Sequence, residues 1–260
     1  MAFGQALKTW RTLRGFSQMS LANSAGISPR HVSFLETGRS TPTEGMVLRL
    51  SDTLHLPLRE KNGLLAAAGF SRRFEERGWD DEHIKAQKEA LELILTSHNP
   101  YPALALDRGM NVLQTNEGFG IFISLFPEIP EASANTNFVE LILAPGPMKD
   151  AIENWQEVAG AIVARLRSHV WVAGKNDVLE DLLERILQFP DVEAAMHRDF
   201  RSGNNFPMLL THIKGLDGTK TSWFSTITTF GTAQDVMLDE IWIEQFHPAN
   251  DVTRALLSKQ

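Results

Sequence analysis

The chain of 260 residues contains no cysteine, and this absence excludes several kinds of site at once. Disulfides, zinc sites with thiolate ligands and cysteine nucleophiles all require that residue. The apolar runs are far shorter than the roughly 20 residues that span a bilayer. The first 15 residues form an amphipathic pattern without the apolar region or cleavage site of a signal peptide. We therefore expect a cytoplasmic protein that is neither secreted nor inserted in a membrane.

The sequence also lacks the short motifs of common enzymes. Its eight histidines are too far apart for a local metal-binding pair, and no Gly-x-Ser-x-Gly turn is present. The segment 118–120 lacks the third glycine of a dinucleotide-binding loop, and 215–220 lacks the spacing of a phosphate-binding loop. These absences predict no catalytic residue, no metal and no cofactor. An enzyme whose residues converge from distant segments remains a third alternative.

Negative charge predominates, with 32 acidic against 25 basic residues, but the excess lies in one part of the chain. Residues 1–77 contain 11 basic and 6 acidic side chains, a net charge of +5. The remainder contains 14 basic and 26 acidic side chains, a net charge of −12. A basic module joined to an acidic one predicts a polyanionic partner for the first module. Two domains with independent surface charge would give the same numbers.

Five short helices are predicted within residues 1–70, because apolar residues recur at three- and four-residue spacing between clear breakers. Ser17 and Ser28 are candidate N-caps, and Pro29 occupies the first position of a helix. Gly26 permits a tight turn between the second and third helices. The pattern predicts an all-α helix-turn-helix domain at 1–70, followed by a charged linker at 71–79.

The segment SQMSLANSAGISPRHVSFLETGRSTP strongly resembles the Xre/Cro-repressor-like DNA-binding family, and the resemblance covers residues 3–69. It implies a sequence-specific bacterial transcription regulator with double-stranded operator DNA as its partner. The helix that follows the turn lies in the major groove in this geometry, and the residues predicted to approach bases are Ser28, Pro29, Arg30, His31, Ser33 and Phe34. The residues that match phosphate-contacting positions are Gln18, Thr37 and Arg39. Because the chain has a single helix-turn-helix, we also expect a homodimer on two half-sites.

Two of these assignments have plain alternatives. His31 fits a role in supporting the helix cap as well as it fits a base contact. Arg39 fits an ordinary solvated charge, although its position after a helix-ending glycine favours phosphate. A helix-turn-helix that binds protein instead of DNA is a further alternative for the whole module.

From residue 80 onward, helical and extended patterns alternate. A helix near 84–95 precedes two short extended runs, and further helices are predicted at 119–125, 138–143, 149–172, 178–188, 192–200 and 250–257. The extended runs are 103–107, 111–116, 208–214, 221–230 and 236–246. The pattern predicts an α+β, PAS-like domain at 80–260, with an antiparallel sheet covered by helices.

Four motifs carry a second resemblance, PALALDRGMNVLQTN, NWQEVAGAIVARLR, HRDF and FSTITTFGTAQDVMLDEIWIEQFHPAND. They look like the MmyB-type ligand-binding domain, which follows an Xre-type helix-turn-helix in a large group of bacterial regulators. This resemblance covers residues 80–257 and implies a small apolar ligand, with fatty acids among the candidates.

The ligand-binding candidates are Phe119, Arg165, Trp171, His212, Trp223 and Phe224. Core packing is the favoured role for each of the aromatic ones, because cores and apolar pockets share their composition. His212 and Arg165 are the polar groups suited to a carboxylate head. In the rival hypothesis, the second domain recruits a protein partner and binds no small ligand. An apolar cavity with a few polar groups favours the sensor, and a filled core with a large exposed apolar patch favours the rival.

Overall fold

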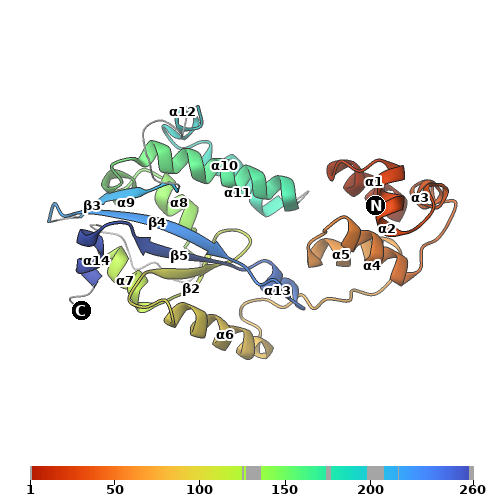
Figure 1. The fold of residues 1–260 in the computed structure, drawn as a ribbon, viewed down its shortest axis with the longest axis horizontal. Helices are drawn as coiled ribbons and strands as arrows, with labels where there is room; N and C mark the ends of the chain where they lie inside the picture. The colour runs from red at the N-terminus through yellow and green to blue at the C-terminus, as the bar shows by residue number, and fades with distance from the viewer. Residues whose placement is uncertain are drawn as a thin grey trace. The chain divides into compact units, whose positions relative to one another are not determined.

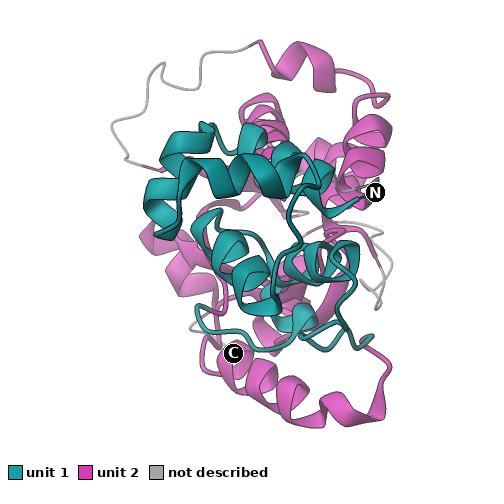
Figure 2. Cartoon of the chain, turned by 90° about the vertical axis from the view of Figure 1, so that its right-hand side faces the viewer, with its two compact units in different colours: residues 1–78, 231–239 teal, residues 79–230, 240–260 magenta. Residues whose placement is uncertain are grey.

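The computed structural model describes residues 2–124, 126, 136–173, 177–197, 208–215 and 217–257. Residues 125 and 198–200, predicted as helical, lie outside the described part, as do three residues of the HRDF motif. The chain divides into two compact units, one formed by residues 1–78 with 231–239 and one by residues 79–230 with 240–260 (Figure 2). Each unit has its own apolar core.

The first unit is helical, as predicted. Its helices are α1 (Phe3–Leu13), α2 (Gln18–Ala25), α3 (Pro29–Glu36), α4 (Glu44–Thr53), α5 (Leu58–Ala67) and the short α13 (Val236–Asp239). Ser17 and Ser28 cap α2 and α3, because their hydroxyl oxygens accept the backbone N–H of Ser20 and His31. Gly26 ends α2 with a φ of 64°. The local signals in the sequence therefore place the turn of the helix-turn-helix.

Close packing holds α1 against the end of α3. A Cβ atom on Gly4 would lie 2.5 Å from the carbonyl oxygens of Leu35 and Glu36, so only glycine fits there without movement. Leu7 of α1 and Val32 of α3 are fully buried in the core of this unit. The helix α3, which follows the turn of the helix-turn-helix, is thus held in place by its buried side.

Residues 70–78, here called the arm, follow α5 and remain in the first unit. Asn62 of α5 is 1% exposed, and its Oδ1 accepts the N–H groups of Arg73 and Phe74 at 3.0 Å. Its Nδ2 donates to the carbonyl oxygen of Phe74 at 2.7 Å. Arg73 also pairs with Glu44 of α4 at 3.7 Å. The stretch predicted as a linker is therefore hydrogen-bonded to a helix over part of its length.

The chain comes back to the first unit at residues 231–239, here called the return segment. The side chain of Val236 is fully buried, and its N–H donates to the carbonyl oxygen of Glu75 in the arm at 3.0 Å. Asp239 accepts the N–H of Leu58, the first residue of α5, at 2.8 Å. The prediction of one strand at 236–246 is wrong in its first part, because Val236–Asp239 is helical and the strand begins at Trp242.

The second unit is built on a five-stranded antiparallel sheet with the strand order β2-β1-β5-β4-β3. The strands are β1 (Ala103–Leu106), β2 (Val112–Thr115), β3 (Thr211–Lys214), β4 (Lys220–Thr228) and β5 (Trp242–Pro248). The helical elements are η1 (Glu82–Ile84), α6 (Lys85–Thr96), α7 (Glu117–Ile123), α8 (Phe138–Leu143), α9 (Pro147–Ala151), α10 (Trp155–Ala173), α11 (Asp177–Ile186), α12 (Val192–Ala195) and α14 (Asp251–Leu257). The predicted α+β fold is confirmed, with α10 along one face of the sheet and α6 along the other (Figure 1).

The strand register decides which side chains share a face, because directly opposed residues of antiparallel strands point the same way. Ser225 pairs with Phe246, and Ile227 pairs with Glu244. The inner face therefore carries Thr211, Ile213, Trp223, Ser225, Glu244 and Phe246. The outer face carries His212, Ser222, Phe224 and His247.

The predicted helix at 149–172 is two helices, because β3 interrupts it. Ile152 forms an isolated bridge with Ile213. Asn154 accepts the N–H of His212 at 2.9 Å and donates to the carbonyl oxygen of Leu210 at 2.7 Å. These contacts with a strand some 60 residues away end α9 before α10 begins.

Candidate functional site

The helix-turn-helix presents α3 with its polar side outward. Val32 and Leu35 are buried, whereas all six predicted base-contact residues keep exposed or half-exposed surface. Among them Arg30 is exposed, and its guanidinium carbon lies 5.1 Å from the centre of the Phe34 ring. This cation–π contact restrains the guanidinium over the outer side of α3. His31 takes part in the cap through its backbone N–H, which leaves its ring for another role.

A buried ion pair links the first three helices. Glu36, whose side chain is 2% exposed, accepts from Nε and Nη2 of Arg11 in α1. Gln18 at the start of α2 donates to Glu36 Oε2 at 2.7 Å. Nη1 of Arg11 donates to the carbonyl oxygen of Phe16 at 2.7 Å. The network connects the start of α2 with the end of α3 and uses one of the two N–H bonds of the Gln18 amide.

The other two predicted phosphate residues differ in what they can offer. The hydroxyl of Thr37 donates to the carbonyl oxygen of Ser33 at 2.8 Å, inside its own helix end. Arg39 is exposed and follows Gly38, whose φ of 73° turns the chain away from α3. Of the two, Arg39 has the charge and the exposure that a phosphate contact requires.

The second unit contains a partly open cavity of about 220 Å³ between the inner face of the sheet and helices α7 to α10, and the exposed side chains of Met208 and Leu209 are part of its wall. Its wall is mainly apolar, and its apolar side chains include Phe122, Phe138, Ile142, Val158, Ile162 and Phe246. The aromatic rings pack against one another, with Phe122 and Phe246 stacked at 5.2 Å between centres. The arrangement can hold a compact apolar molecule.

Three polar side chains meet at one place in this apolar wall. Arg165 of α10 faces Glu244 of β5, with Nη1 to Oε1 and Nη2 to Oε2 both at 3.5 Å. Ser225 of β4 donates to Glu244 Oε1 at 2.8 Å. Glu244 is 5% exposed, so its charge is compensated mainly by Arg165.

His169 lies one helical turn after Arg165. Its ring is 3.8 Å from the ring centre of Trp242, at 85°. Burial, together with a smaller effect of the nearby charge of Arg165, lowers the pKa of His169 to about 4. The ring is therefore neutral at neutral pH and adds no charge near the Arg165–Glu244 pair.

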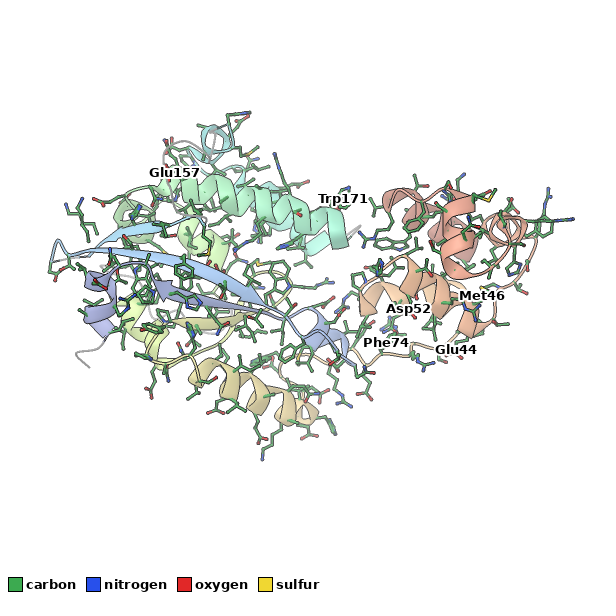
Figure 3. All side chains as sticks on the ribbon, in the orientation of Figure 1. Glu44, Met46, Asp52, Phe74, Glu157 and Trp171 are labelled. Atoms are coloured by element: carbon green, nitrogen blue, oxygen red, sulfur yellow. The ribbon has the colours of Figure 1, made fainter. Side chains whose placement is uncertain are left out.

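The six predicted ligand residues occupy different environments. Arg165 lines the cavity. Trp223 is fully buried on the inner face behind Phe122, whose ring centre lies 5.4 Å away, and Phe119 packs 6.0 Å from Phe138. His212 and Phe224 point to the outer face, where they contact Ser222 and His247. Trp171 is 58% exposed near the end of α10 (Figure 3).

Sequence reasoning missed Glu244 and Ser225. The signal for Glu244 was present, because a strand with Trp242 and Phe246 on its buried face places residue 244 on that face as well. A carboxylate at such a buried position needs a hydrogen-bonding or charged partner and so indicates a polar site within the apolar core. Ser225 gave no comparable signal.

The described residues hold no cluster of three His, Asp or Glu side chains that suits a metal ion. The described helices also include none that is long and apolar enough to cross a membrane.

Together, the fold and the two sites define a helix-turn-helix protein with an α+β unit that contains a mainly apolar cavity. The family model described as the MmyB-like transcription regulator ligand binding domain matches residues 88–259, and a helix-turn-helix model matches residues 7–61. The chain therefore belongs to the MmyB-like transcription regulators. No curated protein matches it significantly. Both predicted resemblances are confirmed.

Proposed function

We propose that this regulator changes its affinity for operator DNA when a small, mainly apolar ligand occupies the cavity of the second unit. The observation that carries the proposal is the cavity itself, with an apolar wall and three polar groups at one place. This is the composition typical of small-molecule sites, where a few polar groups orient the ligand. The hypothesis of a protein-recruiting domain gains no such support.

The DNA-binding part of the proposal rests on α3. Arg30 reads a guanine through its O6 and N7 atoms, and Phe34 supports the guanidinium from the side. Arg39 and the second N–H of Gln18 bind phosphates. A homodimer places two copies of α3 in successive major grooves of an inverted repeat, which doubles the contact area of a single small module.

A ligand acts as a switch only if it binds the DNA-competent and incompetent states unequally. Coupling of this kind is typically about 1–3 kcal/mol, which corresponds to a 5- to 150-fold change in DNA affinity. The ligand also stabilises the fold, by about 2.7 kcal/mol at a concentration one hundred times its Kd.

The test fills the cavity. Ala161 of α10 lines it, and Ala164 on the same helix is exposed, so Ala161→Phe and Ala164→Phe make the same change inside and outside the site. An operator is first selected from random DNA. Lipids and other small apolar compounds are then screened by thermal shift, and the operator titration is repeated with each hit.

We expect hits that stabilise the native chain and Ala164→Phe but not Ala161→Phe, and that alter operator affinity. Hits that stabilise both variants equally would place the ligand elsewhere. Hits that leave DNA affinity unchanged would refute the switch, and a screen without hits would favour partner recruitment. Light scattering of the operator complex tests the dimer, which a single chain per operator would refute.

A further inference from the structure

The polar part of the cavity constrains the head group of the ligand. Arg165 and Glu244 face each other there with opposite charges, and Ser225 donates a hydrogen bond to Glu244. Among the described residues that line the cavity, no other side chain is charged. Within this described lining, a ligand therefore meets one positive and one negative group whose charges cancel.

We propose that the cavity selects ligands whose head group is neutral and both donates and accepts hydrogen bonds, such as an aliphatic alcohol or a primary amide. The inference rests on the proposed function, because it takes this cavity as the ligand site. It differs from the expectation that Arg165 binds a carboxylate head, since the structure already pairs Arg165 with a protein carboxylate.

A fatty-acid carboxylate meets the like charge of Glu244 in the polar part of the cavity. To reach Arg165 it must also approach Glu244, because the two groups are 3.5 Å apart. Two carboxylates that share a site cannot both remain ionised easily, so one of them takes up a proton. A carboxylic acid with a pKa near 4.3 is protonated in only about one molecule in 500 at pH 7. The carboxylate therefore loses affinity, and an amine loses it in the same way beside Arg165.

A neutral head group avoids this conflict. The N–O distances of 3.5 Å are longer than the roughly 2.7–3.2 Å of a good hydrogen bond, so the pair is not closed. A hydroxyl or amide oxygen accepts from Arg165, and its O–H or N–H donates to Oε2 of Glu244. The buried carboxylate of Glu244 and the partly exposed guanidinium of Arg165 then each gain a partner without added charge.

The size of the cavity selects the probes. A volume of about 220 Å³ equals that of roughly seven water molecules in the liquid, which suits a chain of about eight carbon atoms. The probes are 1-octanol, octanamide, octanoic acid and octylamine, which share the chain and differ in the head group. Their affinities for the full chain are measured by isothermal titration calorimetry at pH 7.5.

We expect octanol and octanamide to bind at least tenfold more tightly than octanoate and octylamine. Glu244→Gln keeps the shape and the acceptor for Ser225 but leaves Arg165 uncompensated, so octanoate should gain at least tenfold relative to octanol. Arg165→Gln makes the opposite change and should favour octylamine. Ser225→Ala leaves the ion pair intact and should preserve the native order of head groups.

The outcomes separate the two proposals. Tightest binding of octanoate to the native chain, or an unchanged order in both charge variants, would overturn the head-group inference while the cavity remained a ligand site. Failure of all four probes to bind the native chain and the charge variants would count against the proposed function instead.

Discussion

The buried pair of Arg11 and Glu36 allows a prediction about the stability of the DNA-binding unit. The side chains are 11% and 2% exposed, and Glu36 accepts three hydrogen bonds from Arg11 and Gln18. Glu36→Ala leaves the guanidinium of Arg11 buried without its counter-charge. Removal of one partner from a buried pair costs about 3–5 kcal/mol, so we expect a loss of this size in the free energy of unfolding.

A double change provides the control. Arg11→Met with Glu36→Leu removes both charges and fills similar volume, and such exchanges are often close to neutral. We therefore expect the double variant to be more stable than Glu36→Ala alone. The difference would show that the loss arises from the uncompensated charge rather than from the position.

The measurement must report on the first unit alone. Trp10 is the one tryptophan in residues 1–78 and 231–239, and it is buried in the core of that unit. The ¹⁹F signal of Trp10 in chain labelled with 5-fluorotryptophan follows urea unfolding of this unit separately from the other. A loss below about 1 kcal/mol for Glu36→Ala, the value of exposed ion pairs, would refute the reasoning.

Three further predictions concern other parts of the chain. Arg30→Ala should weaken operator binding by about 1–3 kcal/mol and reduce the sequence preference at one base position. Arg39→Ala should weaken binding to all DNA and lower the slope of log affinity against log salt concentration by about one. Titrations on operator and random DNA at several salt concentrations distinguish the two effects. Because the pKa of His169 is lowered in the folded chain, the unfolded chain binds more protons than the folded chain between pH 6.5 and about 4. Stability is therefore lost as the pH falls through this range. Tm measured against pH should fall less steeply in His169→Gln than in the native chain. Gly4→Ala should destabilise the first unit by roughly 1–3 kcal/mol, because its Cβ meets two carbonyl oxygens. Gly45→Ala in open space on α4 should stabilise it by about 0.5–1 kcal/mol in the same urea titration.

Local sequence signals were sufficient for helices α1 to α5 of the first unit. Ser17 and Ser28 do cap α2 and α3, and Gly26 does take the left-handed conformation, because each of these roles depends on neighbours within a few residues. The strand alternation also placed Trp223 and Phe224 on opposite faces of the sheet.

The errors arose where distant segments decide the structure. The short helix Val236–Asp239 is bonded to Glu75 and Leu58, more than 150 residues earlier, and an apolar run gives no sign of such partners. The break between α9 and α10 likewise depends on contacts of Asn154 with the start of β3. For the same reason the sequence did not show that Arg165 faces Glu244.

The return segment has a consequence for synthesis on the ribosome. Asp239 supplies the acceptor for the first N–H of α5, and Val236 completes the packing beside the arm. Because the return segment follows residues 79–230 in the sequence, the DNA-binding unit obtains its last contacts only after most of the second unit has been made. Nascent chains that stop before residue 231 thus contain every residue of α1 to α5 but lack the segment that caps and covers α5.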